Sequence, residues 1–249
     1  MSPNQSKKRR VAFAFSAIDL VVVIATIAIL GIIVLPALAL SRESTRQIQC
    51  LDNLKRISLG FRSWMLDHNY KVPWDVPRSE GGAKAPPAWE TNGQVTRARF
   101  FVCSNEMETP KILTCPSETA VAPFEDWASC ASGTNSSGVV SNAPLSYFLM
   151  TGVEWHYPTL IFGGDENLES TGDNLGDITF GYLAGMMPPS TAYWNSTTMH
   201  RSAGNVFLAD GSVQKTTDDS IRKVLMQGLD ELGGSNSMSI VTKIVVNKP

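Results

Sequence analysis

Residues 7–40 read KKRRVAFAFSAIDLVVVIATIAILGIIVLPALAL, a basic block followed by a long apolar run. The only ionisable side chain between residues 11 and 40 is that of Asp19. At about 1.5 Å per residue, the uncharged run from Leu20 to Leu40 spans roughly 30 Å, the thickness of a bilayer core. The pattern predicts a membrane-spanning helix, with the basic block in the cytoplasm and the rest of the chain exported.

Three interpretations of this segment compete. A cleaved secretory signal has a basic region, an apolar region and a small-residue site, here Ala37-Leu38-Ala39. A plain signal anchor needs only the basic block and the apolar run. A prepilin-type signal is cut before the apolar run, between Ala14 and Phe15, so that the run stays in the mature chain.

Asp19 favours the prepilin-type interpretation. A carboxylate at the centre of a membrane costs roughly 2.5–3.5 kcal/mol and usually has a functional partner. After a cut between Ala14 and Phe15, Asp19 is the fifth residue of the mature chain. Its carboxylate can then pair with the terminal amine of a neighbouring subunit, which neutralises both charges in an apolar setting.

Residues 14–25, AFSAIDLVVVIA, resemble the signal of the type IV pilin and pseudopilin family. The family pattern has Gly before the cut, then Phe, and Glu at the fifth mature position, whereas this chain has Ala14, Phe15 and Asp19. Pro36 stands where the family often has a helix-bending proline. The resemblance implies a prepilin peptidase that cuts after Ala14 and methylates the amine of Phe15.

A second resemblance covers more of the chain. His200, nine further residues and then Asp210-Gly211 match the H-x9-DG element of a large prepilin-associated domain family. Residues 50–55 (CLDNLK) are similar to the C-x-N-N-L-K helix of that family, and residues 115–117 (CPS) to its Cys-Pro-Ser strand end. The resemblance implies a fold and a location more than a mechanism.

The rest of the pattern predicts an α+β fold that is pilin-like. A long N-terminal helix, its first part transmembrane, packs on a small antiparallel β-sheet with long loops. We expect a leader at residues 1–14, an assembly helix at 15–40, an amphipathic continuation at 41–68 and an exported globular domain at 69–249. The continuation carries apolar residues at spacings of three and four, which is one face of a helix. These residues are Ile48, Leu51, Leu54, Ile57, Phe61 and Trp64.

Several shorter elements are predicted within the globular domain. Residues 145–149 have a strand pattern, and residues 111–117 a strand that Pro116 ends. Residues 206–209 and 212–215 flank Asp210-Gly211, which predicts a hairpin with a type I′ turn. Residues 220–232 predict a helix, and 240–246 a last strand. The acidic, Gly-rich residues 162–177 are typical of a loop.

The cysteines favour disulfide bonds over a metal site. None of the four has CxxC spacing and no histidine lies near them in sequence, which makes a zinc site improbable. An even number of cysteines in an exported chain indicates disulfides, with three connectivities open. The residues concerned are Cys50, Cys103, Cys115 and Cys130.

Two other groups invite a chemical interpretation. His200 and Asp210 have the residue types of an acid–base dyad, but Asp-Gly is a turn sequence, which favours a structural role. The acidic stretch offers oxygen ligands of the kind that calcium takes, although its spacing is not that of an EF-hand. A solvated acidic loop is the plainer interpretation. The acidic residues are Asp165, Glu166, Glu169, Asp173 and Asp177.

The sequence therefore predicts a structural protein with no cofactor. It is expected in a bacterial cytoplasmic membrane as a single-pass protein, and then in a type IV pilus or type II secretion filament. Its partners would be other pilin-like subunits, the prepilin peptidase and the membrane. The net charge of −2 gives no reason to expect nucleic-acid binding. We find no enzyme motif; the alternative is an exported binding or enzymatic domain whose N-terminal segment is only a signal or anchor.

Overall fold

The chain of 249 residues divides into two compact units, residues 1–44 and 45–249. The computed structural model describes residues 17–84, 93–118, 122–132, 145–151, 156–171, 178–179, 189–197, 199–200, 202–232 and 240–242. The expected leader, with Ala14 and Phe15, lies outside these residues. One helix, α1 (Ala17–Asp67), contributes to both units.

The part of α1 in the first unit is largely apolar. Its 18 residues from Ala17 to Val34 contain none that is buried, and they are long and apolar enough to cross a membrane. This agrees with the expected N-terminal apolar helix by length and composition. The helix does not end at Pro36 but continues to Asp67.

The part of α1 in the second unit has one buried face. Leu54, Ile57, Phe61 and Trp64 are all buried, as the spacing predicted. Ile48 is 67% exposed and lies outside this face. The buried stripe therefore begins with the turn that carries Cys50 and runs to the end of the helix.

An antiparallel sheet forms the centre of the second unit. Its strand order is β4-β8-β1-β2-β6-β7, and a separate pair joins β3 and β5. The strands are β1 (Tyr147–Thr151), β2 (Ile161–Asp165), β3 (Leu168–Ser170), β4 (Ile178–Thr179), β5 (Ala192–Trp194), β6 (Ala203–Leu208), β7 (Val213–Thr217) and β8 (Ile240–Thr242). The second unit is thus α+β with a small antiparallel sheet, as predicted.

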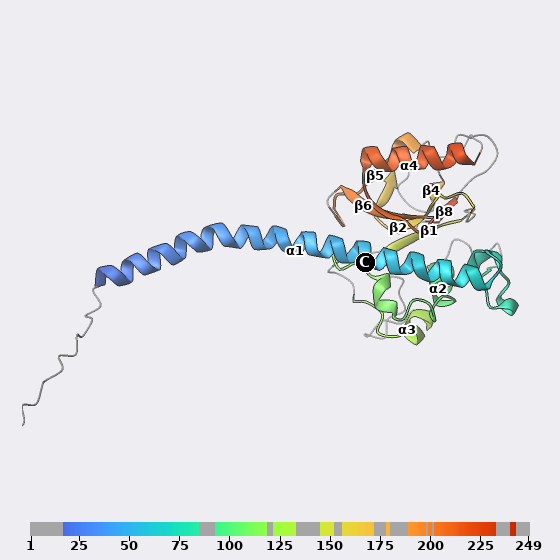
Figure 1. Ribbon diagram of the computed structural model, residues 1–249, viewed down its shortest axis with the longest axis horizontal. Coiled ribbons are helices and arrows are strands. Elements are labelled where there is room, and N and C mark those ends of the chain that lie inside the picture. Colours follow the sequence, from blue (N-terminus) through green and yellow to red (C-terminus); the bar gives the residue numbers. More distant parts are fainter. Residues whose placement is uncertain are drawn as a thin grey trace, which may run out of the picture. The chain divides into compact units, whose positions relative to one another are not determined.

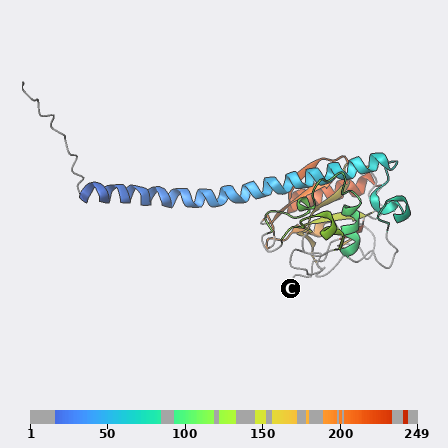
Figure 2. The same cartoon turned by 90° about the horizontal axis from the view of Figure 1, so that it is seen from below.

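Helices cover both faces of the sheet. Figure 1 shows α4 (Asp218–Glu231) on one face and the second part of α1 on the other. Every residue of β2 is buried, which fits a strand with both faces covered. The short helices α2 (Gly93–Phe101) and α3 (Trp127–Ser132) lie across α1 from the sheet, and they stand in front in Figure 2.

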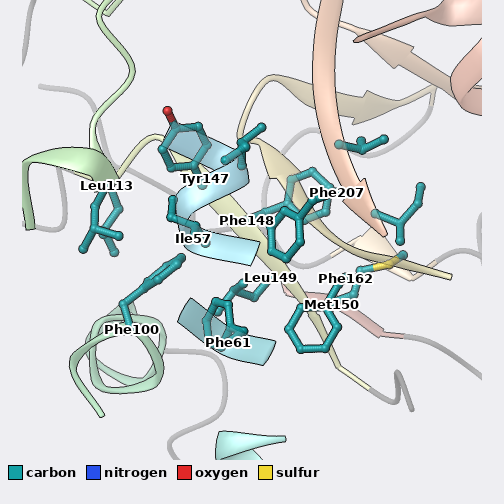
Figure 3. Packing of buried hydrophobic residues seen from close by; sticks show 14 of the residues in the cluster. Ile57, Phe61, Phe100, Leu113, Tyr147, Phe148, Leu149, Met150, Phe162 and Phe207 are labelled. Carbon is teal, nitrogen blue, oxygen red and sulfur yellow. The ribbon is translucent and has the colours of Figure 1, made fainter. Parts of the chain in front are cut away.

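Aromatic side chains join these layers (Figure 3). The ring of Phe61 in α1 lies 5.6 Å from that of Phe100 in α2, measured between centroids. It lies 5.4 Å from the ring of Phe162 and 6.4 Å from that of Phe207, in β2 and β6. Phe61 is therefore the side chain through which α1 contacts the sheet and α2 together.

Most local predictions are confirmed. The strand at 145–149, the hairpin around Asp210-Gly211 and the helix near 220–232 appear as β1, β6–β7 and α4. Thr217 caps α4, since its side chain accepts from the Ser220 backbone while the Ser220 hydroxyl accepts from the Thr217 backbone.

Three local predictions are wrong. Residues 110–113 form a 3-10 helix and not a strand, because Thr109 caps the segment and a proline begins it. Residues 161–165 and 168–170 are strands β2 and β3, inside the stretch predicted to be a loop. The hairpin turn is not type I′, which requires positive φ at two residues, because only Gly211 has it. Further 3-10 helices in the described residues are Pro73–Asp75, Arg78–Glu80 and Pro189–Thr191.

Candidate functional site

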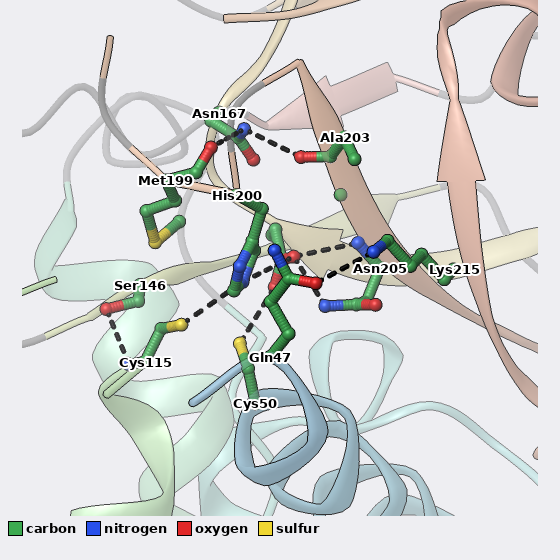
Figure 4. A network of polar contacts seen from close by, with 12 residues as sticks. Gln47, Cys50, Cys115, Ser146, Asn167, Met199, His200, Ala203, Asn205 and Lys215 are labelled. Atoms are coloured by element: carbon green, nitrogen blue, oxygen red, sulfur yellow. Dashed lines mark hydrogen bonds and ion pairs between the residues drawn. The ribbon is translucent and has the colours of Figure 1, made fainter. Parts of the chain in front are cut away.

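Two cysteines, one histidine and one aspartate lie close together next to the sheet (Figure 4). They come from four separate segments: Cys50 from α1, Cys115 from the turn after the 3-10 helix at 110–113, Asp165 from the end of β2, and His200 from the turn before β6. None is more than 4% exposed. We call them the Cys–His–Asp cluster.

The contacts within the cluster are short. The Cys115 Sγ lies 3.3 Å from the His200 Nε2, and the same nitrogen lies 3.4 Å from the Asp165 Oδ2. The Cys50 Sγ lies 3.3 Å from the Asp165 Oδ1 and 3.2 Å from the hydroxyl of Tyr147. The two sulfurs and an imidazole nitrogen all lie within 4.8 Å of one another.

Asp165 is held by the neighbouring strand. The backbone N–H of Asn205 and its side-chain amide donate to the Asp165 Oδ2, at 2.7 and 2.9 Å. Burial raises the pKa of Asp165 to about 7 in spite of these donors and of His200. A buried carboxylate is costly unless it is hydrogen-bonded, paired with a positive charge or bound to a metal ion.

Cys115 is positioned by contacts on both sides of its turn. Its backbone N–H donates to the Ser146 hydroxyl at 2.9 Å, and that hydroxyl donates to Glu118 at 2.7 Å. The Asn53 amide in α1 donates to the carbonyl of Thr114 at 3.2 Å. A hydrogen bond from Cys50, and then the contact with His200, lower the pKa of the Cys115 thiol to about 6. Cys50 is different, because burial raises its pKa.

His200 has an unusual backbone. Its φ is +53°, in the left-handed region that residues with a Cβ rarely adopt. Asn167 fixes this turn, because its side-chain amide donates to the carbonyls of Met199 and Ala203, both at 3.1 Å. The strained backbone aims the imidazole at the two sulfurs, and such strain is common at functional sites.

The Asp-Gly end of the H-x9-DG element contacts α1. The Lys55 ammonium donates to the carbonyl of Gly211 at 2.8 Å. Gly211 has φ +86°, and a Cβ there would lie 2.7 Å from the Cδ of Arg62. Asp210 is exposed, and its Oδ1 accepts from the Ser212 backbone at 2.7 Å. The interpretation of Asp210 as a turn residue is thus supported, and the acid that meets His200 is Asp165.

The three sequence elements that suggested a family meet here. Residues 50–55 supply Cys50, the amide that bonds to Thr114 and the ammonium that bonds to Gly211. Residues 115–117 supply Cys115, and the H-x9-DG element supplies His200 and the turn. Each element therefore connects the second part of α1 to the sheet or to its loops.

The predicted disulfides do not form in this structure. All four cysteines are free and buried. Cys50 and Cys115 lie together in the cluster, whereas burial raises the pKa of both Cys103 and Cys130, that of Cys130 to about 12. An argument from local spacing missed the grouping of two cysteines with His200, because each comes from a different part of the chain.

The acidic stretch is not gathered as a calcium loop in the residues that the structure describes. Asp165 belongs to the cluster, Glu166 is buried, and Glu169 accepts from the Tyr193 hydroxyl and the Asn195 amide at 2.7 Å each. Asp173 and Asp177 lie outside the described residues.

The cluster is not arranged as a catalytic triad. In a triad the acid holds one imidazole nitrogen while the nucleophile contacts the other. Here the Cys115 Sγ and the Asp165 Oδ2 approach the same nitrogen, Nε2. Two sulfurs and an imidazole nitrogen within 4.8 Å of one another are instead donors of the kind that hold a metal ion.

Comparison with known proteins adds no assignment: no family model matches the chain, and neither a curated protein nor a solved structure matches it.

Proposed function

We propose that this chain is a structural, pilin-like subunit of a type IV pilus or type II secretion-type filament. The observation that carries the proposal is the uncovered apolar part of α1. Its 18 residues from Ala17 to Val34 contain none that is buried. An apolar helix of that length needs lipid or other apolar helices around it. The membrane supplies lipid before assembly, and other subunits supply apolar helices in a filament.

Asp19 supports the same proposal. It is the one acidic residue in the first turn of α1, at the start of the apolar part. A carboxylate there suits pairing with the terminal amine of a neighbouring subunit, if a prepilin peptidase cuts before Phe15. The basic residues 7–10 support a leader in the cytoplasm and an exported unit of residues 45–249.

The cluster agrees with a role other than catalysis. Its four residues are each at most 4% exposed, so they offer a substrate no open surface. The contacts of Cys50, Asn53 and Lys55 connect α1 to the domain, which suits a subunit whose helix bears mechanical load.

The proposal is tested by the mature N-terminus and by Asp19→Ala. Mass spectrometry of chains from native membranes should find a start at N-methylated Phe15. Asp19→Ala should permit processing but reduce filament yield by roughly tenfold, as expected for loss of a buried charge pair worth on the order of 1.4 kcal/mol or more. The yield is measured by shearing filaments from cells and immunoblotting.

A matched control lies on the same helix. Asp52 is also acidic, its side chain is 58% exposed, and its contact with Arg56 is an exposed pair. Asp52→Ala should therefore leave yield unchanged. A mature chain that starts at Leu40, or full filament yield from Asp19→Ala, contradicts the proposal. Function that survives exchange of residues 1–40 for a generic export signal would favour the exported-domain alternative.

A further inference from the structure

The Cys–His–Asp cluster has the donors of a transition-metal site. Two sulfurs and one imidazole nitrogen, those of Cys50, Cys115 and His200, lie within 4.8 Å of one another (Figure 4). The Asp165 carboxylate contacts Cys50 and His200. Thiolate and imidazole ligands are preferred by Zn²⁺, which takes four ligands in a closed structural site.

The sulfur and nitrogen donors lie close enough together to share one ion. With Zn–S bonds of about 2.3 Å and Zn–N bonds of about 2.0–2.1 Å, two ligand atoms of a tetrahedral site lie roughly 3.3–3.8 Å apart. The distance from the Cys115 Sγ to the His200 Nε2 is 3.3 Å. The Asp165 carboxylate borders the same group through both of its oxygens, because its Oδ2 lies 3.4 Å from the His200 Nε2 and its Oδ1 lies 3.3 Å from the Cys50 Sγ.

The surroundings hold the donors in place. Asn205 donates twice to Asp165, and Ser146 fixes the backbone of Cys115. Asn167 fixes the turn of His200. Partners of this kind orient the ligands of metal sites and tune their affinity.

A hollow lies beside the cluster. Its volume is about 470 Å³, and its lining includes Asp52, Thr114, Cys115 and Glu118.

We propose that Cys50, Cys115 and His200 bind one Zn²⁺ ion as a structural site, with Asp165 as the fourth ligand once its carboxylate turns one oxygen toward the ion. Each thiol binds as a thiolate and releases its proton to solvent. The ion ties α1 to β2, to the turn at Cys115 and to the turn before β6. This site does not depend on the proposed filament role, since it lies within residues 45–249.

The test uses the full chain, extracted from membranes in detergent and purified with a reductant. Elemental analysis should find about one zinc per chain, because four ligands make one closed site. After removal of zinc with a chelator, addition of Co²⁺ should give the visible and charge-transfer bands of thiolate-bound tetrahedral cobalt. This spectrum identifies the ligands in the unaltered chain, so it holds even if a variant does not fold.

Variants then assign the site. Cys115→Ser and His200→Asn should each lose the bound zinc. Cys103→Ser is the matched control, because Cys103 is also 0% exposed but lies outside the cluster, and it should keep the zinc. Asn205→Ala should weaken zinc affinity by about 10- to 100-fold, as expected for loss of a group that orients a ligand.

Three results would overturn the proposal. The first is a chain without stoichiometric zinc, or with a different metal in its place. The second is a Cys50–Cys115 disulfide, seen as two and not four alkylated cysteines when membranes are denatured and alkylated before any reductant is added. The third is zinc that Cys103→Ser loses and Cys115→Ser retains.

Discussion

The two parts of α1 share one helix but not one environment. From Ala17 to Val34 the helix is largely apolar and has no buried residue. From Cys50 to Trp64 it has a single stripe of buried residues, and its other side carries charged groups such as Asp52 and Arg56. Hydrophobicity alone thus does not define the core of this protein: the first part needs lipid or another chain, and the second part finds its partner in the same chain.

The largest expected effect is a loss of stability that concerns the second part of α1 alone. Phe61→Ala removes a ring that contacts Phe100, Phe162 and Phe207, and should lower the free energy of unfolding by about 3–5 kcal/mol. The measurement is urea unfolding of the detergent-solubilised chain, followed by tryptophan fluorescence. Leu59 lies on the same helix but is 53% exposed. Leu59→Ala should change stability by less than about 0.5 kcal/mol, and an equal loss in both variants would refute the one-sided stripe.

The next largest effect is a loss of membrane insertion, which concerns the first part of α1 alone. Ile27→Asp places a charge in the middle of the apolar part and should disfavour membrane insertion by roughly 2.5–3.5 kcal/mol. The fraction of chain that resists alkaline extraction from membranes should fall, whereas Ile27→Leu should leave that fraction unchanged. Urea unfolding of the chain that is recovered should be unchanged, because Ile27 has no part in the core. Retention of the Asp variant in membranes would contradict the proposed span.

The smallest expected effect tests the contact between α1 and the hairpin of β6 and β7. Gly211 and Gly81 have φ of +86° and +85°, but a Cβ meets Arg62 only at Gly211 and open space at Gly81. Gly81→Ala should cost about 1–2 kcal/mol from backbone strain alone. Gly211→Ala should cost about 1 kcal/mol more, because Arg62 must move. Equal losses of unfolding free energy would mean that the hairpin does not press on α1.

Local pattern predicted the elements but not the cluster. The stripe at Leu54, Ile57 and Phe61, and the Asp-Gly turn, depend on residues close in sequence, so periodicity and turn chemistry were enough. The strand predicted at 111–117 is wrong. An apolar run before a proline is typical of a strand, but the cap at Thr109 begins a 3-10 helix there. The loop predicted around Asp165 is wrong. Glycines and acidic residues are typical of loops, whereas here the glycines let neighbouring strands approach closely.

The cluster was missed for a different physical reason. Cys50 and Asp165 are 115 residues apart in the chain, and Cys115 and His200 are 85 apart. Zinc motifs are recognised in sequence by ligands a few residues apart, and no such spacing exists here. The signal that was available is that each of the three elements of the second resemblance carries one of these residues, namely Cys50, Cys115 or His200.

The contact between Lys55 and Gly211 joins residues that are 156 positions apart in the chain. A ribosome makes α1 early, and the strand that carries Phe207 only after most of the chain has been made. Until then the stripe around Phe61 lacks the ring of Phe207, although the ring of Phe100 is made much earlier. Apolar surface that waits for a distant partner favours aggregation, so completion of this core depends on late-synthesised β6.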